Sequence, residues 1–442
     1  MIKKIYISKI SIIIALKIFI FLMFFLAFLT IAYKNYPFTK FFSINLGTSS
    51  STYGSLFLIL NYIYGGFKLG ENKISDSVYS QNLSGILALI FTYFQLCILF
   101  NNWLNIIPII VIMVANLGIS VASSIMFSYF YNKFYPPKNT IIIHNNKEVN
   151  INSLINKIKS RPDKYILKDI ISTNQDLDSI FECIKSAKIV FLCKIDLEYR
   201  KIIIDYCYKH NISVYFIPLI SDILINKASF FQISDTPTLA CNYKELSVEQ
   251  QIIKRIFDLI LSSILLIITL PIIIITAIFI KLYDFGPIFF IQNRVTIHNK
   301  VFKLYKFRSM IVDAEKDGIA RLASKNDSRI TPIGKIIRML RIDELPQLIN
   351  ILKGDMSIVG PRPERPEIIA KNVAEIPAFE YRTKVKAGIT GFAQIKGKYN
   401  TPPIDKLIMD LMYIESYSIL QDLKLVFLTI KVIFIPESSE GI

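Results

Sequence analysis

Two adjacent carboxylates near a group of arginines are the residues whose types and spacing best fit chemistry. Asp343 and Glu344 stand at the expected start of a short helix. Four arginines lie near them in the chain: Arg338, Arg341, Arg362 and Arg365. A helix N-terminus offers free N–H groups and a positive dipole, and an arginine can bind phosphate oxygens through two hydrogen bonds at once. Paired carboxylates can hold a divalent metal or supply a nucleophile. The stretch therefore predicts a site for a phosphate-bearing substrate.

A purely structural role for the same residues is the alternative. Asp343 could cap a helix that we expect to run to Lys353 and to end at Gly354. Arg341 and Asp343 could form a surface ion pair, which stabilises little. The acidic pair and its arginines fit both a substrate site and a purely structural role. The surrounding motifs are needed to distinguish the two.

Those motifs resemble the bacterial sugar transferase family. The run from Arg341 to Pro363 carries the resemblance most strongly. The resemblance covers about residues 253–434, and further motifs follow in the family's order: Lys254–Asp258, Gly286–Arg294, Lys306–Met310, Gly388–Gly391 and Gly397–Thr401. Members are polyprenyl-phosphate sugar-1-phosphate transferases, also called monotopic phosphoglycosyl transferases. The layout is similar to the long members, which have four transmembrane helices before the catalytic part.

The resemblance implies a reaction between a UDP-sugar and polyprenyl (undecaprenyl) phosphate, which gives polyprenyl diphosphate-sugar and UMP. In the family this is the first step of capsular, exopolysaccharide or other glycan repeat-unit assembly. The first acid of the pair is the family's nucleophile, so the resemblance assigns that role to Asp343 and implies a covalent aspartyl-phosphosugar intermediate. It assigns Glu344 to the support of Mg²⁺, and both acids are expected metal ligands. Mg²⁺ needs only one or two carboxylates beside phosphate oxygens.

Two arginines match family positions that contact phosphate. Arg338 precedes the acidic pair, and Arg362 lies between Pro361 and Pro363. Prolines restrict the backbone on both sides of Arg362, as a preorganised phosphate clamp requires. A surface charge beside a helix is the alternative for Arg362.

Four further residues are candidates for phosphate or substrate binding. Lys306 and Arg308 alternate along a strand-like stretch, and Gln292 and Arg294 follow the apolar segment closely. Each pair could bind a diphosphate or lipid headgroups, and each could equally form a solvated polar face. The sequence leaves these alternatives open.

The composition is that of a membrane protein. The 442 residues are 52% hydrophobic and 19% charged, with a net charge of +17. Basic flanks suit an anionic lipid bilayer, and no compact basic module supports nucleic acid as a partner. The five cysteines form no C-x-x-C pair and the three histidines are scattered, which argues against disulfides, structural zinc and a histidine-based site.

Four apolar segments in residues 1–139 predict four transmembrane helices. They are Ile10–Tyr33, Ser51–Phe67, Leu83–Phe100 and Ile106–Tyr131, the second barely long enough. Lysines flank the expected inner ends, so the positive-inside rule puts the N-terminus and the chain after Lys133 in the cytoplasm. We expect a multi-pass protein of the bacterial inner membrane with its catalytic domain on the cytoplasmic face. A homo-oligomer is compatible with this layout.

Residues 140–246 predict a Rossmann-like α/β domain. Short apolar runs at Thr140–Ile143, Ile189–Cys193 and Val214–Ile217 alternate with amphipathic stretches, which is typical of a parallel sheet. No glycine occurs from Thr140 to Glu245, so the turn that would approach a pyrophosphate is missing. We interpret the domain as degenerate and non-catalytic.

Residues 247–442 are expected to form a mostly helical catalytic domain that begins with a membrane segment. The apolar run Ile256–Ile280 is long enough to span a bilayer, but a crossing would put the catalytic part outside the cell. Pro271 provides a helix break. We therefore predict a re-entrant membrane hairpin over about residues 254–281, in which Pro271 is the break.

Three other functions would each require a feature of the sequence. A transporter predicts ionisable residues inside the apolar segments, and only Lys17 qualifies. A membrane-anchored polysaccharide assembly factor without catalysis predicts a broken acidic pair, whereas Asp343 and Glu344 are intact. A sugar-nucleotide dehydratase in the middle domain predicts a glycine-rich loop and a Tyr-x-x-x-Lys pair, and residues 140–245 contain neither.

Overall fold

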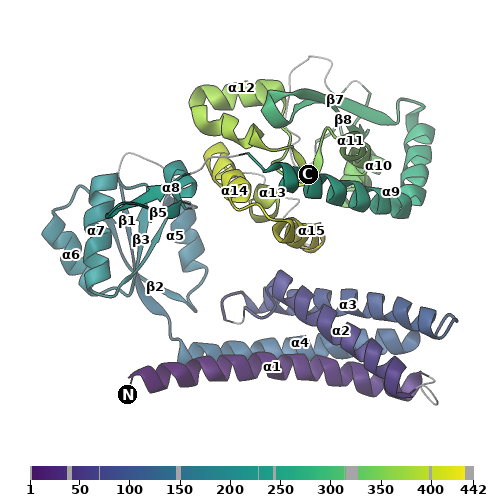
Figure 1. The fold of residues 1–442 in the computed structure, drawn as a ribbon, viewed down its shortest axis with the longest axis horizontal. Helices are drawn as coiled ribbons and strands as arrows, with labels where there is room; N and C mark the ends of the chain where they lie inside the picture. Colours follow the sequence, from purple (N-terminus) through teal and green to yellow (C-terminus); the bar gives the residue numbers. More distant parts are fainter. Residues whose placement is uncertain are drawn as a thin grey trace. The chain divides into compact units, whose positions relative to one another are not determined.

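The chain divides into two compact units, which we describe separately. The computed structural model describes residues 2–36, 42–68, 70–145, 151–226, 228–241, 245–312, 314, 327–397 and 401–433. Unit 1 is Met1–Ile217 and unit 2 is Pro218–Ile442. Figure 1 shows the elements of both. The predicted boundaries after residues 139 and 246 stay predictions, and residues 398–400 of the Gly397–Thr401 motif lie outside the described residues.

Four helices with a shared aromatic interior begin unit 1. They are α1 (Ile2–Asn35), α2 (Phe42–Tyr64), α3 (Ile74–Leu99) and α4 (Ile107–Phe134). Phe24 stacks on Phe57 with ring centroids 4.5 Å apart, and Phe28 stacks on Tyr53 at 4.4 Å. Asn116 donates a hydrogen bond of 3.2 Å to the buried Tyr53 hydroxyl. Aromatic contacts thus join α1 to α2, and a buried hydrogen bond joins α2 to α4.

Four helices of the described chain are long and apolar enough to cross a membrane. They are Ser11–Asn35, Ile74–Leu99, Ile107–Phe134 and Val248–Asp284. The first three coincide with the first, third and fourth apolar segments expected from the sequence. The second expected segment forms α2, which contains several serines and tyrosines and is not among these four. The helices identify the chain as a membrane protein, as its composition indicated.

A four-stranded parallel sheet forms the rest of unit 1. Its strand order is β2-β1-β3-β4, and every neighbouring pair is parallel. Its elements are β1 (Lys138–His144), α5 (Ile151–Lys159), β2 (Tyr165–Ser172), α6 (Leu177–Lys185), β3 (Ile189–Cys193), α7 (Leu197–Lys209) and β4 (Ser213–Phe216). Both faces of the central strands are covered, which explains their unbroken apolar runs. The expected strands and helices are present. The strand β2 is additional, and the kinship with dinucleotide-binding domains stays a prediction.

Unit 2 is mostly helical, with short two-stranded sheets. It starts with α8 (Ile220–Ile225) and the hairpin β5 (Ser229–Ile233) and β6 (Thr236–Ala240). The next elements are α9 (Val248–Asp284), β7 (Phe289–Val295), η1 (Ile297–Asn299), β8 (Val301–Phe307), α10 (Pro332–Met339), η2 (Ile342–Glu344), α11 (Gln347–Lys353) and β9 (Ser357–Val359). They are followed by α12 (Pro366–Glu375), η3 (Pro377–Lys384), β10 (Gly388–Thr390), α13 (Phe392–Lys396), α14 (Pro403–Glu415) and α15 (Ile419–Ile433). β7 pairs antiparallel with β8, and β9 pairs parallel with β10.

The long helix α9 runs through Pro271 without interruption. Its 37 residues form one helix with Pro271 inside it, whereas the sequence led us to expect a helix break at this position. Figure 1 shows that the ribbon of α9 changes direction along its length. A proline removes one backbone N–H and crowds the preceding turn, which bends a helix that is otherwise retained. The re-entrant path in a membrane stays a prediction.

A buried lysine fastens the start of α9 to the rest of unit 2. Lys254 Nζ donates to a carboxylate oxygen of Asp422 at 2.6 Å, to the Tyr413 hydroxyl at 3.0 Å and to the Val359 carbonyl at 2.9 Å. All three ammonium donors are therefore used. The side chains of Lys254 and Asp422 are 7% and 0% exposed, and burial raises the pKa of Asp422 against the opposing charge of Lys254. Each of these two buried charges is compensated only while the other is present.

Removing Lys254 alone should therefore cost more stability than replacing the whole pair. Lys254→Met leaves Asp422 as an uncompensated buried carboxylate, and we expect a loss of about 3–5 kcal/mol. Lys254→Met/Asp422→Leu should recover part of that loss, because an apolar pair carries no buried charge. Thermal unfolding of the purified protein in detergent measures both. A double variant that unfolds at or below the temperature of Lys254→Met would contradict this account.

Candidate functional site

The acidic pair lies in a tight turn between two helices. α10 ends at Met339, Arg341 has a φ of 58°, and Asp343 and Glu344 lie in the single turn η2 before α11. The left-handed conformation of Arg341 reverses the chain direction there, and such a φ is uncommon outside glycine. α11 ends at Gly354 with a φ of 91°, as expected for a glycine stop. The side chain of Asp343 does not cap α11, because the residue that precedes this helix is Pro346.

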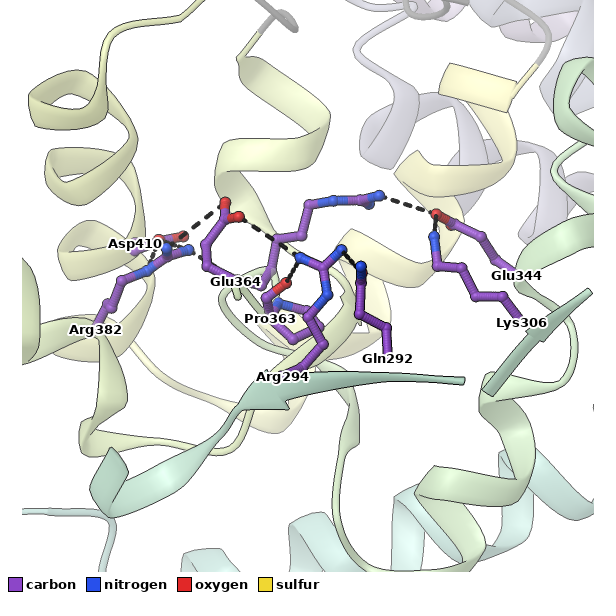
Figure 2. A network of polar contacts seen from close by, with 9 residues as sticks. Gln292, Arg294, Lys306, Glu344, Pro363, Glu364, Arg382 and Asp410 are labelled. Carbon is purple, nitrogen blue, oxygen red and sulfur yellow. Dashed lines mark hydrogen bonds and ion pairs between the residues drawn. The ribbon is translucent and has the colours of Figure 1, made fainter. Parts of the chain in front are cut away.

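Glu344 is held by two cations from distant parts of the chain. Lys306 Nζ and the guanidinium of Arg362 both donate to the same carboxylate oxygen, Oε1, at 3.2 and 3.0 Å. Figure 2 shows the contact between Lys306 and Glu344. The Glu344 side chain is only 13% exposed. Burial alone would raise the pKa of Glu344, but the charges of Lys306 and Arg362 outweigh burial and hold this pKa well below its usual range. Glu344 is therefore an ionised acceptor fixed in place.

Asp343 has the opposite electrostatic setting. Burial and the negative charge of Glu344 raise the pKa of the Asp343 carboxyl, while Lys306, Arg338 and Arg341 oppose that rise. Its carboxylate makes no hydrogen bond to any residue that the structure describes. A carboxylate with raised basicity and unengaged oxygens is suited to attack an electrophile or to bind a metal ion. The two adjacent acids are thus set apart in role by their surroundings.

The predicted phosphate-binding residues divide into two groups. Lys306, Arg338 and Arg362 lie around the acidic pair. The Arg362 side chain is 43% exposed, so one side of its guanidinium remains open to a ligand. Burial lowers the pKa of Lys306, and the neighbouring Glu344 opposes this. Arg308 is directed elsewhere, because its guanidinium pairs with Asp284 at the end of α9.

Arg294 and Gln292 lie behind the acidic pair rather than on it. Arg294 donates to the Pro363 carbonyl at 3.0 Å and to Gln292 Oε1 at 2.6 Å, and it is 3.8 Å from Glu364 (Figure 2). Burial lowers the pKa of Arg294 to about 10, although Glu364 partly opposes this. Both side chains therefore engage protein atoms. Substrate binding by Arg294, Gln292 and Arg308 stays a prediction.

Arg382 and Asp410 are neighbours of the site that the sequence analysis missed. Arg382 donates through Nε to Asp410 Oδ2 at 3.1 Å and through Nη2 to the Arg362 carbonyl at 3.0 Å. Its Nη2 also forms an ion pair with Asp410 Oδ2 at 2.9 Å. Burial raises the pKa of Asp410 to about 6 despite the charge of Arg382. The sequence held one usable signal, because Asp410 shares a helix face with the buried Leu407 and Leu411.

The carboxylates available for a metal ion are few. The described part of the chain holds no group of three or more His, Cys, Asp or Glu residues that could form a metal site. Asp343 and Glu344 fit Mg²⁺ nevertheless, because this ion takes one or two carboxylates and completes its shell with water and phosphate oxygens. A site for Zn²⁺ or another metal that requires more protein ligands does not fit these residues.

Comparisons with known proteins agree with the geometry. The family model for the bacterial sugar transferases matches residues 249–436. The chain is 44% identical over 184 residues to a UDP-N-acetylgalactosamine-undecaprenyl-phosphate N-acetylgalactosaminephosphotransferase of Aeromonas hydrophila, which is 41% of this chain and 43% of that protein. It is 37% identical over 223 residues to a UDP-glucose:undecaprenyl-phosphate glucose-1-phosphate transferase of Escherichia coli K12, which is 49% of this chain and 48% of that protein.

A shorter relative is matched over nearly its whole length. The chain is 41% identical over 191 residues to the uncharacterized sugar transferase EpsL of Bacillus subtilis, which is 43% of this chain and 90% of that protein. The chain thus spans less than half of the two longer relatives and most of the shorter one. Residues 249–436, which the family model matches, contain the acidic pair and every residue described around it.

The electrostatic contrast within the pair can be tested by chemical modification. Carbodiimides modify protonated carboxyl groups, so the raised pKa of Asp343 should keep it reactive at higher pH than Glu344. Lys306→Met removes a charge that lowers the pKa of Asp343, so its labelling should persist to still higher pH. Tandem mass spectrometry of the modified peptide measures both residues. Lys353→Met removes a cation that contacts Tyr305 instead and should leave the profile unchanged. An unaltered profile in Lys306→Met would refute the assignment.

Proposed function

The chain belongs to the bacterial sugar transferase family, and we propose that it transfers a sugar 1-phosphate from a UDP-sugar to polyprenyl phosphate. The products are polyprenyl diphosphate-sugar and UMP. The observation that carries this proposal is the unengaged Asp343 carboxylate beside a Glu344 that is held by Lys306 and Arg362. The relatives named for undecaprenyl-phosphate acceptors support the same acceptor here.

The first step is attack by an Asp343 oxygen on the sugar-linked phosphorus of the UDP-sugar. The bond from this phosphorus to the bridging oxygen breaks, and UMP leaves with the electron pair. The sugar phosphate remains on Asp343 as an acyl phosphate. Lys306 and Arg362 neutralise the charge that develops on the phosphate oxygens, which lowers the barrier between two mutually repelling anions.

The second step regenerates the carboxylate. A phosphate oxygen of polyprenyl phosphate attacks the same phosphorus, the acyl-phosphate bond breaks, and Asp343 departs as a free carboxylate. A diphosphate bridge then joins the lipid to the sugar. The raised basicity of Asp343 favours the attack, and the cations around it keep it ionised between the steps.

Mg²⁺ belongs to this proposal as a cofactor held by Asp343, Glu344 and phosphate oxygens. When bound, the ion would supply positive charge that the diphosphate needs in the transition state. Glu344 is already oriented by Lys306 and Arg362 and would hold its part of the site without rearrangement.

The identity of the sugar and of the glycan is a separate question. The names of the relatives include glucose and N-acetylgalactosamine transferases, so the resemblance does not narrow the donor to one hexose. A role in capsule or exopolysaccharide assembly is part of the proposal, because a polyprenyl diphosphate-sugar is a lipid-linked starting unit for such chains.

The contacts of α9 support a re-entrant membrane segment. Near its start, Arg255 donates to the carbonyls of Ile351 and Leu352. Near its end, Asp284 pairs with Arg308, and Ile280 packs on Phe307. A spanning helix would place these ends on opposite sides of a core about 30 Å thick, yet both ends contact the same folded unit. We propose that both lie on the cytoplasmic face of the inner membrane, where UDP-sugars are found.

The test of the function uses membranes that contain the full chain, a panel of UDP-sugars, Mg²⁺ and polyprenyl phosphate. Wild type should release UMP with at least one donor, and chelation of Mg²⁺ should stop the release. Asp343→Asn keeps the shape of the nucleophile but removes its charge, so UMP release should fall by at least about 10³-fold. The exposed Asp178→Asn should be fully active. Near-normal turnover by Asp343→Asn would refute its role, and a wild type inactive with every donor would favour an assembly factor without catalysis.

The membrane path of α9 can be tested by cysteine labelling. Gln250→Cys and Tyr283→Cys lie near the two ends of α9, and both positions are exposed. A membrane-impermeant thiol reagent should modify both in inside-out vesicles and neither in intact cells. Pro271→Leu removes the cause of the bend and should shift the residue at 283 towards labelling from outside. If the cysteine at 283 is labelled from outside in the protein that keeps Pro271, α9 is a spanning helix.

A further inference from the structure

The main chain that carries Arg362 is held at three successive residues. Arg382 donates to the Arg362 carbonyl, and Arg294 donates to the Pro363 carbonyl, each at 3.0 Å. The carboxylate of Glu364 lies 3.8 Å from both Arg294 and Arg382 (Figure 2). The Glu364 carbonyl accepts from the Val295 N–H at 3.0 Å. The base of the Arg362 side chain is therefore fixed, although its guanidinium is 43% exposed.

Arg382 occupies the centre of this arrangement. It comes from η3, and its side chain is only 4% exposed, while that of Asp410 on α14 is 1% exposed. Asp410 contacts Nε and Nη2 of the Arg382 guanidinium. The guanidinium is thereby oriented towards the Arg362 carbonyl and Glu364. A buried guanidinium with this many directed contacts keeps a single orientation.

We propose that Arg382, oriented by Asp410, is a positioning residue that sets where the Arg362 guanidinium meets Glu344 and an arriving diphosphate. This inference rests on the proposed function. An arginine side chain has many rotamers, so its tip is placed accurately only when its main chain is fixed and its partner is in reach. Arg382 fixes the main chain, and Glu344 supplies the partner. Misplacement of a charge-stabilising group by about 1 Å can cost orders of magnitude in rate.

Variants that test the positioning role of Arg382 should alter its contacts with Asp410 and with the Arg362 carbonyl. Arg382→Lys keeps the positive charge, but an ammonium on a shorter reach cannot reproduce the planar fork that joins Asp410 to the Arg362 carbonyl. Asp410→Asn keeps an acceptor of similar shape and removes the charge that orients Arg382. Arg161→Lys is the control, because Arg161 also pairs through its guanidinium with a carboxylate, that of Asp163 in unit 1, although this pair is less buried.

A double-mutant cycle separates positioning from a general effect on folding. In the wild-type background, Arg382→Lys should lower kcat/KM for UMP release by about tenfold, mostly through kcat. In the Arg362→Ala background the same substitution should change kcat/KM by less than about twofold, because the group that it positions is gone. Asp410→Asn should behave like Arg382→Lys, and Arg161→Lys should be silent. Equal losses in both backgrounds would overturn the proposal and identify a merely structural pair.

A binding measurement keeps this test distinct from the test of the function. Calorimetric titration of the same full-length variants with UDP reports the diphosphate contact without catalysis. Arg382→Lys should weaken UDP binding by about threefold when Arg362 is present. In the Arg362→Ala variant, the same substitution should leave UDP binding unchanged. If wild type binds UDP and releases no UMP, the proposed reaction fails and this cycle still decides the positioning role. If wild type neither binds UDP nor releases UMP, both proposals fail. If Arg382→Lys does not fold, Asp410→Asn carries the cycle alone.

Discussion

Glu344 stays ionised in a mostly buried position because cations surround it, and two of them reach one of its oxygens. An unpaired buried carboxylate would be protonated or would destabilise the fold. Lys306 comes from β8 and Arg362 from the loop after β9, so this one contact joins three chain segments that are distant in sequence. Each segment then needs its own support. β8 is paired with β7 along its full length, and the Arg362 loop is held by Arg294 and Arg382.

The same segments are tied to the long apolar helix α9. Arg255 donates to carbonyls at the end of α11, and Asp258 accepts from the Ser357 hydroxyl and the Ile358 N–H in β9. α11 directly follows the acidic pair, and β9 directly precedes the Arg362 loop. The elements that flank the site are thus joined to α9 by charge-assisted hydrogen bonds, of which those of Asp258 are buried and those of Arg255 partly buried. A lipid phosphate presented beside α9 would meet a site whose position relative to that helix does not vary.

Local signals were enough to predict the acidic pair and its nearest cations, because they lie in contiguous motifs with unusual residue types. The parallel strands β1, β3 and β4 were predicted from apolar runs, whereas β2 was missed because Lys168 and Asp169 interrupt its pattern. Pro271 was expected to break a helix that in fact continues, because a proline can bend a helix whose other turns keep their hydrogen bonds. Arg382 and Asp410 could not be paired in advance, because their contact depends on how η3 packs against α14.

The surplus of cations around the acidic pair has a reason beyond substrate affinity. The pKa of Asp343 is already raised by burial and by Glu344, and a bound diphosphate would add further negative charge and raise it more. A protonated Asp343 could not attack phosphorus. Lys306, Arg338 and Arg341 oppose the rise in the pKa of Asp343, so each cation that neutralises the donor also keeps the nucleophile ionised. The same cations thus neutralise the donor diphosphate and keep Asp343 ionised. This explains why a site with two acids is surrounded by more than two cations.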